Sequence, residues 1–243
     1  MNMTNKIHKT AIIGEHVKLG KNVAVGPYSV IEGHVDLGDD VVIGAHCVVD
    51  GNTTIGNGCQ LFTGAVIGSP PQDRKHQKKD KVFLNIGANN IFREYVTVNP
   101  GTIEGGAETR IGDNNLFMAC CHVAHDCKIG SDCVLANYVG LSGHVTIEDR
   151  AVIGGCSKVN QDVAPFSLVD GNPATLRGLN IVGLKRADIL VPNQMALRRA
   201  FKILFSSGLN RSNAVLQVKE QLNGLPEIHR VIEFIQISKR GIS

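Results

Sequence analysis

Aliphatic residues recur along the first two thirds of the chain with a period of six. Every sixth position over residues 7–67 is Ile, Leu or Val, and Gly follows most of these positions. The same period, with two Phe residues among the aliphatics, returns over 86–98 and again over 111–159. An α-helix repeats every 3.6 residues and an ordinary strand every two, so neither produces this spacing.

A period of six fits a short flat strand followed by a corner. Three such sides close a triangular coil of about 18 residues, and successive coils pair as parallel strands about 4.8 Å apart. The pattern therefore predicts a mainly β fold, a parallel β-helix of seven to eight coils whose aliphatic positions point inward. The periodicity leaves the hand of this helix open.

Two segments break the period, one that begins at Ser69 and one that spans about 99–110. We expect both to be loops that project from the β-helix. The hexads stop after Pro165, and Asp170-Gly171-Asn172-Pro173 is typical of a turn.

The end of the chain has a helical pattern instead. From about residue 192 apolar residues recur at helical spacing, Ser212 is a plausible N-cap, and Pro226 suits a first helical position. We expect a β-helix domain over 1–184 and a small α-helical domain over 185–243.

Composition narrows the class of protein. The 243 residues are 43% hydrophobic and 19% charged, and the net charge of +3 is too small to indicate nucleic-acid binding. No run of 18 apolar residues occurs, so we expect a cytoplasmic protein without a transmembrane segment. The seven cysteines include no Cys-x-x-Cys pair, which argues against a zinc ribbon or a disulfide framework and favours small buried residues.

The densest group of polar residues is His122-Val123-Ala124-His125-Asp126, followed by Gly143-His144. Val123 and Leu141 are equivalent inward positions one coil apart. This register places Gly143 beside His125 and His144 beside Asp126. A histidine next to a carboxylate can act as a general base toward a hydroxyl, and a glycine N–H can stabilise an oxyanion.

Two other interpretations of this group remain open. Outward positions of a β-helix are polar in any case, so the side chains could be solvated surface residues. Alternatively, three histidines can hold zinc, which makes a metal-dependent enzyme on the same fold the competing hypothesis.

The chain from residue 7 to about 165 resembles the hexapeptide-repeat acyltransferases, and this resemblance implies a left-handed β-helix. The order of several motifs resembles more specifically the UDP-N-acetylglucosamine O-acyltransferase family of lipid A biosynthesis. These motifs are His122–Asp126, Leu141–His144, Pro70–Asp73 and Asn180–Arg186.

The resemblance implies that His125 deprotonates the 3-hydroxyl of the sugar, which then attacks a 3-hydroxyacyl thioester on acyl carrier protein. Asp126 would be the partner of His125, and Gly143 the oxyanion donor. No cofactor or metal is implied. The residues that match substrate contacts are Asp73, Lys75, His122, His144, Gln161, Asn180 and Arg186.

The family resemblance also implies a homotrimer whose active sites lie between subunits. Outward positions between 120 and 144, near Cys120, Cys121, Tyr138 and Leu141, suit such packing. The basic loop that follows Pro70 suits an acidic carrier protein and a nucleotide diphosphate.

The chain departs from the family pattern in two places. It lacks about 18 residues, one complete coil, around a Val-His-Gln-Phe stretch, where Val159-Asn160-Gln161-Asp162 stands instead. Val182 and Ala187 replace a usual Glu and Arg in the segment that contacts the nucleotide. The alternatives are therefore a paralogue that acylates a different amino-sugar nucleotide to give an amide, and a non-catalytic β-helix protein.

Overall fold

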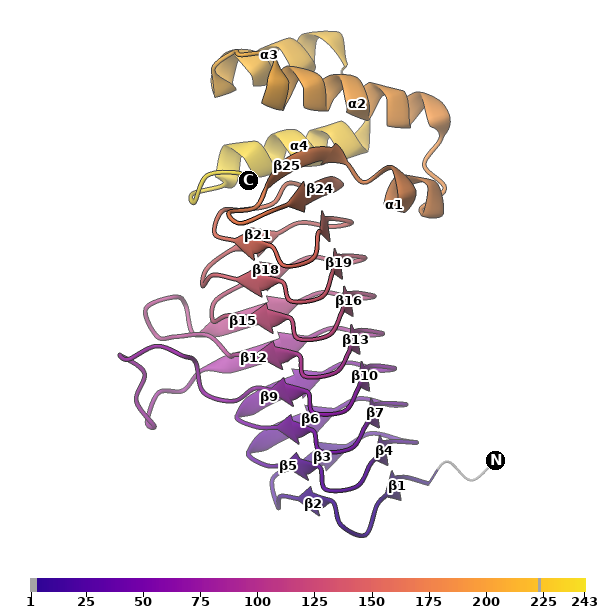
Figure 1. Ribbon diagram of the computed structural model, residues 1–243, viewed down its shortest axis with the longest axis vertical. Coiled ribbons are helices and arrows are strands. Elements are labelled where there is room, and N and C mark those ends of the chain that lie inside the picture. The colour runs from indigo at the N-terminus through magenta and orange to yellow at the C-terminus, as the bar shows by residue number, and fades with distance from the viewer. Residues whose placement is uncertain (1–3, 223) are drawn as a thin grey trace.

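The computed structural model describes residues 4–222 and 224–243 and shows a triangular column of short strands with helices at one end (Figure 1). Within these residues, 25 strands form three sheets. Sheet A contains β1 (Lys6–Ile7), β4 (Ala24–Val25), β7 (Val42–Ile43), β10 (Gln60–Leu61), β13 (Ile91–Phe92), β16 (Leu116–Phe117), β19 (Val134–Leu135), β22 (Val152–Ile153), β24 (Ser167–Asp170) and β25 (Thr175–Leu179).

The other two sheets complete the prism. Sheet B contains β2 (Ile12–Ile13), β5 (Val30–Ile31), β8 (Val48–Val49), β11 (Val66–Ile67), β14 (Thr97–Val98), β17 (His122–Val123), β20 (Gly140–Leu141) and β23 (Lys158–Val159). Sheet C contains β3 (Lys18–Leu19), β6 (His34–Leu37), β9 (Asn52–Ile55), β12 (Phe83–Ile86), β15 (Glu108–Ile111), β18 (Lys128–Ile129) and β21 (Thr146–Ile147).

Equivalent sides of successive coils pair in parallel. Ile7 pairs with Val25 and Val123 with Leu141, which is the 18-residue step expected from three hexads. The predicted parallel β-helix is confirmed, since β1–β24 pair in parallel in three sheets and make about eight coils.

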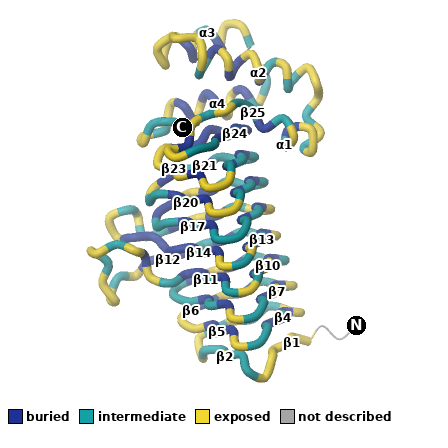
Figure 2. The backbone as a smooth tube through the Cα atoms, in the orientation of Figure 1, coloured by how far each residue is buried: buried dark blue, intermediate teal, exposed yellow. Residues whose placement is uncertain are grey.

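The interior is filled by the hexad positions and by a second inward position two residues earlier (Figure 2). Small residues occupy this second position because less room remains near the corners. Five of the seven cysteines take it and are at most 1% exposed, namely Cys47, Cys59, Cys121, Cys127 and Cys133. The prediction of buried cysteines is confirmed for these five but is wrong for Cys156, which is exposed at a corner, and for Cys120, which is only half-buried.

Both predicted loops project from the corner between sheets B and C (Figure 1). One connects β11 to β12 and the other connects β14 to β15. The Asn99 side chain joins their bases, since its Nδ2 donates to the carbonyl oxygens of Ser69 at 3.0 Å and Pro70 at 3.2 Å.

The β-helix continues past the expected stop at Pro165. Val163 bridges Ile147, and Val169 in β24 pairs with Ile153, so both partners are 16 rather than 18 residues apart. The shortened coil hides this last turn from a count of hexads. β25 then pairs antiparallel with β24 and ends the stack.

Four helices cover that end of the column, in the described residues: α1 (Ile181–Arg186), α2 (Val191–Ser206), α3 (Arg211–Gln221) and α4 (Pro226–Ile237). Pro226 begins α4 as expected, but the N-cap of α3 is Asn210 rather than Ser212, because the Asn210 side chain accepts from the N–H of Asn213. None of these helices is long and apolar enough to cross a membrane. A division of the chain at residue 184 stays a prediction.

Candidate active site

His125 and Asp126 lie at the corner between β17 and β18, beside the bases of both loops. Asp126 has a φ of 60°, one of many corner residues in the left-handed region. This turn brings its carboxylate back toward the preceding residue. The carboxylate oxygen Oδ2 lies 2.7 Å from Nδ1 of His125.

The second loop buries and fixes the Asp126 carboxylate. The backbone N–H and the hydroxyl of Thr102 donate to it at 2.8 and 2.7 Å, and its side chain is only 1% exposed. An ionised carboxylate only accepts hydrogen bonds, so Nδ1 of His125 must carry a proton. The lone pair of His125 then lies on Nε2, the other ring nitrogen.

Gly143 lies directly beside the His125 ring. A Cβ atom on Gly143 would stand 2.7 Å from Cε1 and 2.9 Å from Nε2 of His125, closer than van der Waals contact permits. Within residues 4–222 and 224–243, no backbone acceptor is recorded for the N–H of Gly143. The register inferred from the hexads is therefore correct, and the backbone of Gly143 lies against the ring of His125.

Two further histidines flank the pair. His144 Nδ1 lies 3.7 Å from the Asp126 carboxylate, and its ring meets that of His125 edge to face at 5.2 Å. His122 Nδ1 lies 2.7 Å from the Thr97 hydroxyl. Burial, and then the charge of His125, lower the pKa of His122 below its ordinary value.

This group also has the donor types of a metal site. One ligand atom from each of His125, Asp126 and His144 lies within 4.8 Å of the others. However, the Asp126 carboxylate already accepts three hydrogen bonds, two from Thr102 and one from His125, which leaves little acceptor capacity for a metal ion. The geometry fits a histidine–aspartate general base more directly than a metal centre.

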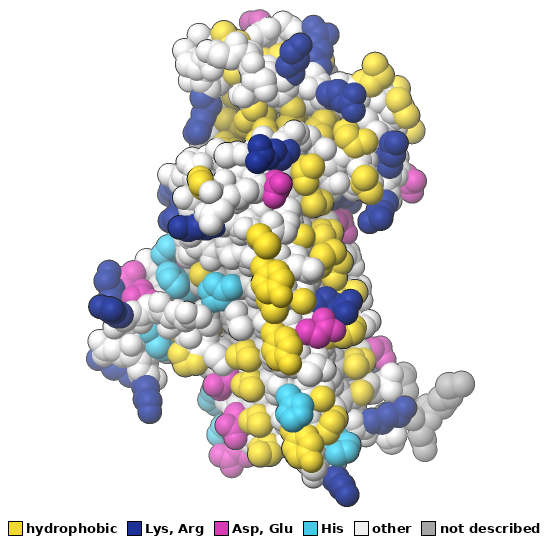
Figure 3. Space-filling view, viewed as in Figure 1, with side chains coloured by type: hydrophobic (Ala, Val, Ile, Leu, Met, Phe, Trp, Pro, Cys, Tyr) yellow, Lys and Arg dark blue, Asp and Glu magenta, His cyan; other side chains and the backbone are white. Residues whose placement is uncertain are grey.

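Other residues predicted to bind substrate lie apart from this cluster. Asp73 accepts the N–H of Lys75 at 3.0 Å within the first loop, and in the described part of the chain no hydrogen bond or ion pair joins Asp73 or Lys75 to His125. The exposed Gln161 lies against Gly241, near the end of the chain. Figure 3 shows Lys and Arg side chains at the tip of the projecting loops and His side chains near their base.

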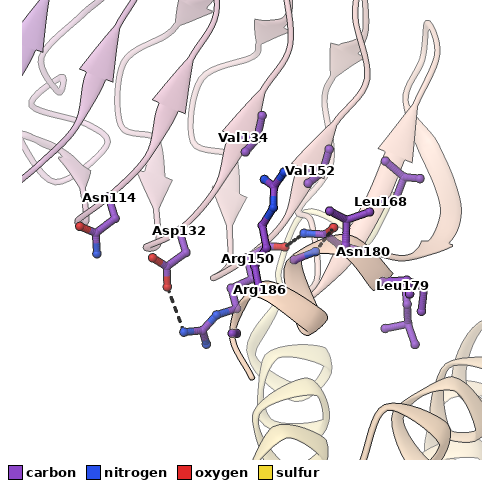
Figure 4. Close-up of a pocket in the computed structure, with 13 residues that line it drawn as sticks. Asn114, Asp132, Val134, Arg150, Val152, Leu168, Leu179, Asn180 and Arg186 are labelled. Carbon is purple, nitrogen blue, oxygen red and sulfur yellow. Dashed lines mark hydrogen bonds and ion pairs between the residues drawn. The ribbon is translucent and has the colours of Figure 1, made fainter. Parts of the chain in front are cut away.

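Asn180 and Arg186 line a cavity of about 710 Å³ between sheet A and α1 (Figure 4), called here the α1 cavity. Asn180 caps α1, since its Oδ1 accepts from Gly183 N and its Nδ2 donates to Arg150 O, both at 2.8 Å. Val182 and Ala187 also line this cavity. The predicted substrate residues near the His125 corner and those in the α1 cavity therefore lie on different faces of one chain.

Sequence reasoning missed the threonines that support the dyad. Thr97 pairs with His122 across adjacent coils, so the hexad register could have identified it. Thr102 belongs to the second loop and Thr109 follows it, and this loop has no periodic pattern. The Thr109 hydroxyl accepts a hydrogen bond from the N–H of Asp126 at 2.8 Å. No signal in the sequence placed Thr102 on the carboxylate.

The fold and the comparisons with known proteins together define a class, the hexapeptide-repeat β-helix acyltransferases. Family models support this class: the bacterial transferase hexapeptide repeat matches residues 16–51 and 108–143, and domain 2 of UDP-N-acetylglucosamine O-acyltransferase matches 162–243. The UDP-N-acetylglucosamine acyltransferase structure from Campylobacter jejuni is 34% identical with a TM-score of 0.84 and covers 98% of both chains. That from Moraxella catarrhalis RH4 is 35% identical with a TM-score of 0.85 and covers 97% of this chain and 98% of its own.

Curated relatives agree over almost the whole length. The acyl-[acyl-carrier-protein]--UDP-N-acetylglucosamine O-acyltransferases of Thermodesulfovibrio yellowstonii and Aliarcobacter butzleri are 42% and 45% identical, each covering 98% of this chain and 99% and 98% of their own. The chain belongs to the UDP-N-acetylglucosamine O-acyltransferase family, and its β-helix is left-handed. Both alignments span 256 positions, more than the 243 residues present here, which agrees with the absence of about one coil.

Proposed function

We propose that the protein transfers a 3-hydroxyacyl group from acyl carrier protein to the 3-hydroxyl of UDP-N-acetylglucosamine, the first step of lipid A biosynthesis. The hydrogen bond of 2.7 Å between His125 and the buried Asp126, with Gly143 packed directly against the same imidazole ring, is the observation that carries the proposal. Relatives at 42% and 45% identity bear this activity in their names.

The reaction follows from the proton positions. Nε2 of His125 takes the proton of the sugar hydroxyl as its oxygen attacks the thioester carbon. The charge that develops on the carbonyl oxygen accepts a hydrogen bond from Gly143 N–H, while Asp126 stabilises the charged imidazole. The carbon–sulfur bond then breaks, and the proton on His125 passes to the leaving sulfur. An ester and a free carrier thiol result.

The test is product formation from 3-hydroxyacyl carrier protein and UDP-N-acetylglucosamine, followed by mass spectrometry. We expect a mass increase of one acyl group and loss of that group under mild base, as an ester requires. A base-stable product from an amino-sugar nucleotide alone would favour the amide-forming paralogue. That alternative rests on Val182 and Ala187 in the α1 cavity, where an acidic and a basic side chain were expected.

We further propose a homotrimer in the cytoplasm, with the α1 cavity of one subunit facing the His125 corner of the next. Tyr28, Tyr95 and Tyr138 are 60–63% exposed, which favours an interface. Cys121 and Leu141 contribute nothing to such a surface, because both point into the core. Light scattering after size exclusion measures the mass, and a fully active monomer would contradict the shared site.

The remaining alternatives have direct tests as well. A metal-dependent enzyme would retain stoichiometric zinc after purification and lose activity with a chelator, whereas the general-base mechanism requires neither. A protein that binds both substrates without turnover would be a non-catalytic member of the family.

A further inference from the structure

A second cavity, of about 530 Å³, adjoins the dyad and is lined in part by Asp126 and His144. It lies over sheet C, between the Asp126–His144 contact and the last residues of the chain, and is called here the tail cavity. Its charged lining beyond the dyad consists of Arg110, Lys128, Glu148, Asp162, Lys239 and Arg240. Figure 3 shows Lys and Arg side chains next to the group of His side chains, at the level where Figure 1 places the C-terminus.

The carboxylates of the tail cavity are already engaged. Asp126 accepts from Thr102 and His125, and Asp162 accepts from Thr146 N and from the Ser238 hydroxyl, each at 2.8 Å. Glu148 lies 3.8 Å from the guanidinium of Arg230, outside the cavity lining.

Most of the cations that line the tail cavity, in contrast, make no ion pair or hydrogen bond through their side chains to the described part of the chain. Arg110 pairs with Glu108 at 3.1 Å, but within residues 4–222 and 224–243 no ion pair or hydrogen bond is recorded for the side chains of Lys128, Lys239 or Arg240. Four cations, Arg110 among them, therefore share this cavity with the carboxylates of Asp126, Glu148 and Asp162. Neutral hydrogen-bond donors do not cancel the charges of Asp126 and Asp162, so the lining has an excess of one positive charge, and the three cations outside ion pairs can donate to a bound anion.

The position of Lys239 and Arg240 is set by the backbone around them. Asp162 N donates to Gly241 O, and Ser243 N donates to Asp162 O, both at 2.9 Å. Asp162 is 4% exposed and also binds the next coil through Thr146. The buried carboxylate thus anchors the chain end against the coil above the dyad, so the two cations stay beside the reaction centre.

We propose that the tail cavity binds a phosphate ester carried by one of the two substrates, with Lys128, Lys239 and Arg240 as its ligands. The inference rests on the proposed function, under which both substrates contain such a group. The carrier protein holds its acyl chain on a phosphopantetheine arm with one phosphodiester, and the acceptor has a diphosphate. Guanidinium and ammonium groups are the usual protein ligands of phosphate.

The test neutralises the two tail cations without altering the backbone that anchors them. Lys239→Gln/Arg240→Gln is compared with the charge-preserving Lys239→Arg/Arg240→Lys and with Lys18→Gln, an exposed cation at the far end of the β-helix. Initial rates give kcat and KM for acyl carrier protein, for acyl phosphopantetheine, for acyl pantetheine without phosphate, and for UDP-N-acetylglucosamine. Thermal unfolding checks that each variant folds.

The neutral double variant should raise the KM of one substrate about five-fold, the size expected for loss of a solvent-exposed phosphate contact. If the donor arm supplies the phosphate, the wild-type preference for acyl phosphopantetheine over acyl pantetheine disappears in this variant. If the nucleotide supplies it, only the KM of the sugar nucleotide rises. The charge-preserving variant should keep wild-type values.

An unchanged KM for both substrates, within two-fold, would overturn the inference while leaving the proposed function intact. A wild-type protein without any acyl transfer would instead refute the proposed function. Calorimetric titration of phosphopantetheine and of UDP into the wild type and the neutral variant then tests the cavity independently, and equal affinities in both proteins would reject it.

Discussion

Replacing Gly143 with Ala should displace the His125 ring and lower the rate of the reaction without changing the stability of the fold. The added Cβ would stand 2.7 Å from Cε1 of His125, so the ring must retreat by roughly 0.7 Å to reach an ordinary contact of about 3.4 Å or more. That movement strains the 2.7 Å bond to Asp126 and shifts Nε2 away from the hydroxyl. A misplacement near 1 Å costs about 10²-fold in rate, so we expect kcat to fall by that order.

The assay is kcat and KM for both substrates under saturating conditions, with thermal unfolding as the measure of stability. Gly140→Ala is the matched control, because it lies in the same coil and a Cβ there would meet nothing within 4 Å. Tm should change little in either variant, since neither glycine has a left-handed φ. A Gly143→Ala enzyme with kcat within three-fold of the wild type would refute the argument that Gly143 holds the ring in place.

Four further results are expected. His125→Ala should lower kcat by about 10² to 10⁴ with normal folding, measured in the transfer assay. Thr102→Val, which removes one of the donors to Asp126, should lower kcat less and reduce the unfolding free energy by about 1–3 kcal/mol. Burial lowers the pKa of His122 in the folded protein, so at acidic pH the unfolded chain binds a proton at His122 more readily than the folded one. The free energy of unfolding should therefore decrease below about pH 6.5, and the decrease should be smaller in His122→Gln. The missing coil removes about 4.8 Å of column, so shorter 3-hydroxyacyl donors should compete best in mixed-donor assays.

Each of these has an outcome that contradicts it. Retention of a tenth of the wild-type rate by His125→Ala would exclude it as the base. For Thr102→Val, an unchanged unfolding free energy would mean that the remaining donors suffice. Equal acid sensitivity of His122→Gln and the wild type would assign the pH effect to other groups, and preferential use of the longest donor would show that the lost coil does not limit the acyl chain.

The hexad period was sufficient to predict the parallel β-helix, though not its hand, and the contacts at the centre of the candidate site. Once Val123 and Leu141 are equivalent, the contacts of His125 with Gly143 and of Asp126 with His144 follow from counting, because each coil repeats the geometry of the previous one. Counting hexads gives no contacts where the six-residue repeat is interrupted. The 16-residue step to Val163 hid the last coil.

Contacts made by segments without the repeat could not be predicted from the sequence either. Thr102 reaches Asp126 from a loop without periodicity, and the chain end reaches Asp162 from about 80 residues further along. Such contacts depend on how a loop or tail folds back onto the column. No local pattern in the sequence predicts the conformation of the loop or of the chain end.

The small inward position near each corner has a chemical consequence for the thiols of this protein. Burial raises the pKa of Cys127 and Cys133 to about 12 and that of Cys121 to about 11, so these thiols stay protonated and resist alkylation and oxidation at neutral pH. Of the two cysteines outside the core, Cys120 is half-buried and Cys156 is exposed. A thiol-reactive fluorophore applied to the folded protein should therefore label Cys156 first, which provides a reporter on the sheet A–sheet B corner without any engineered cysteine.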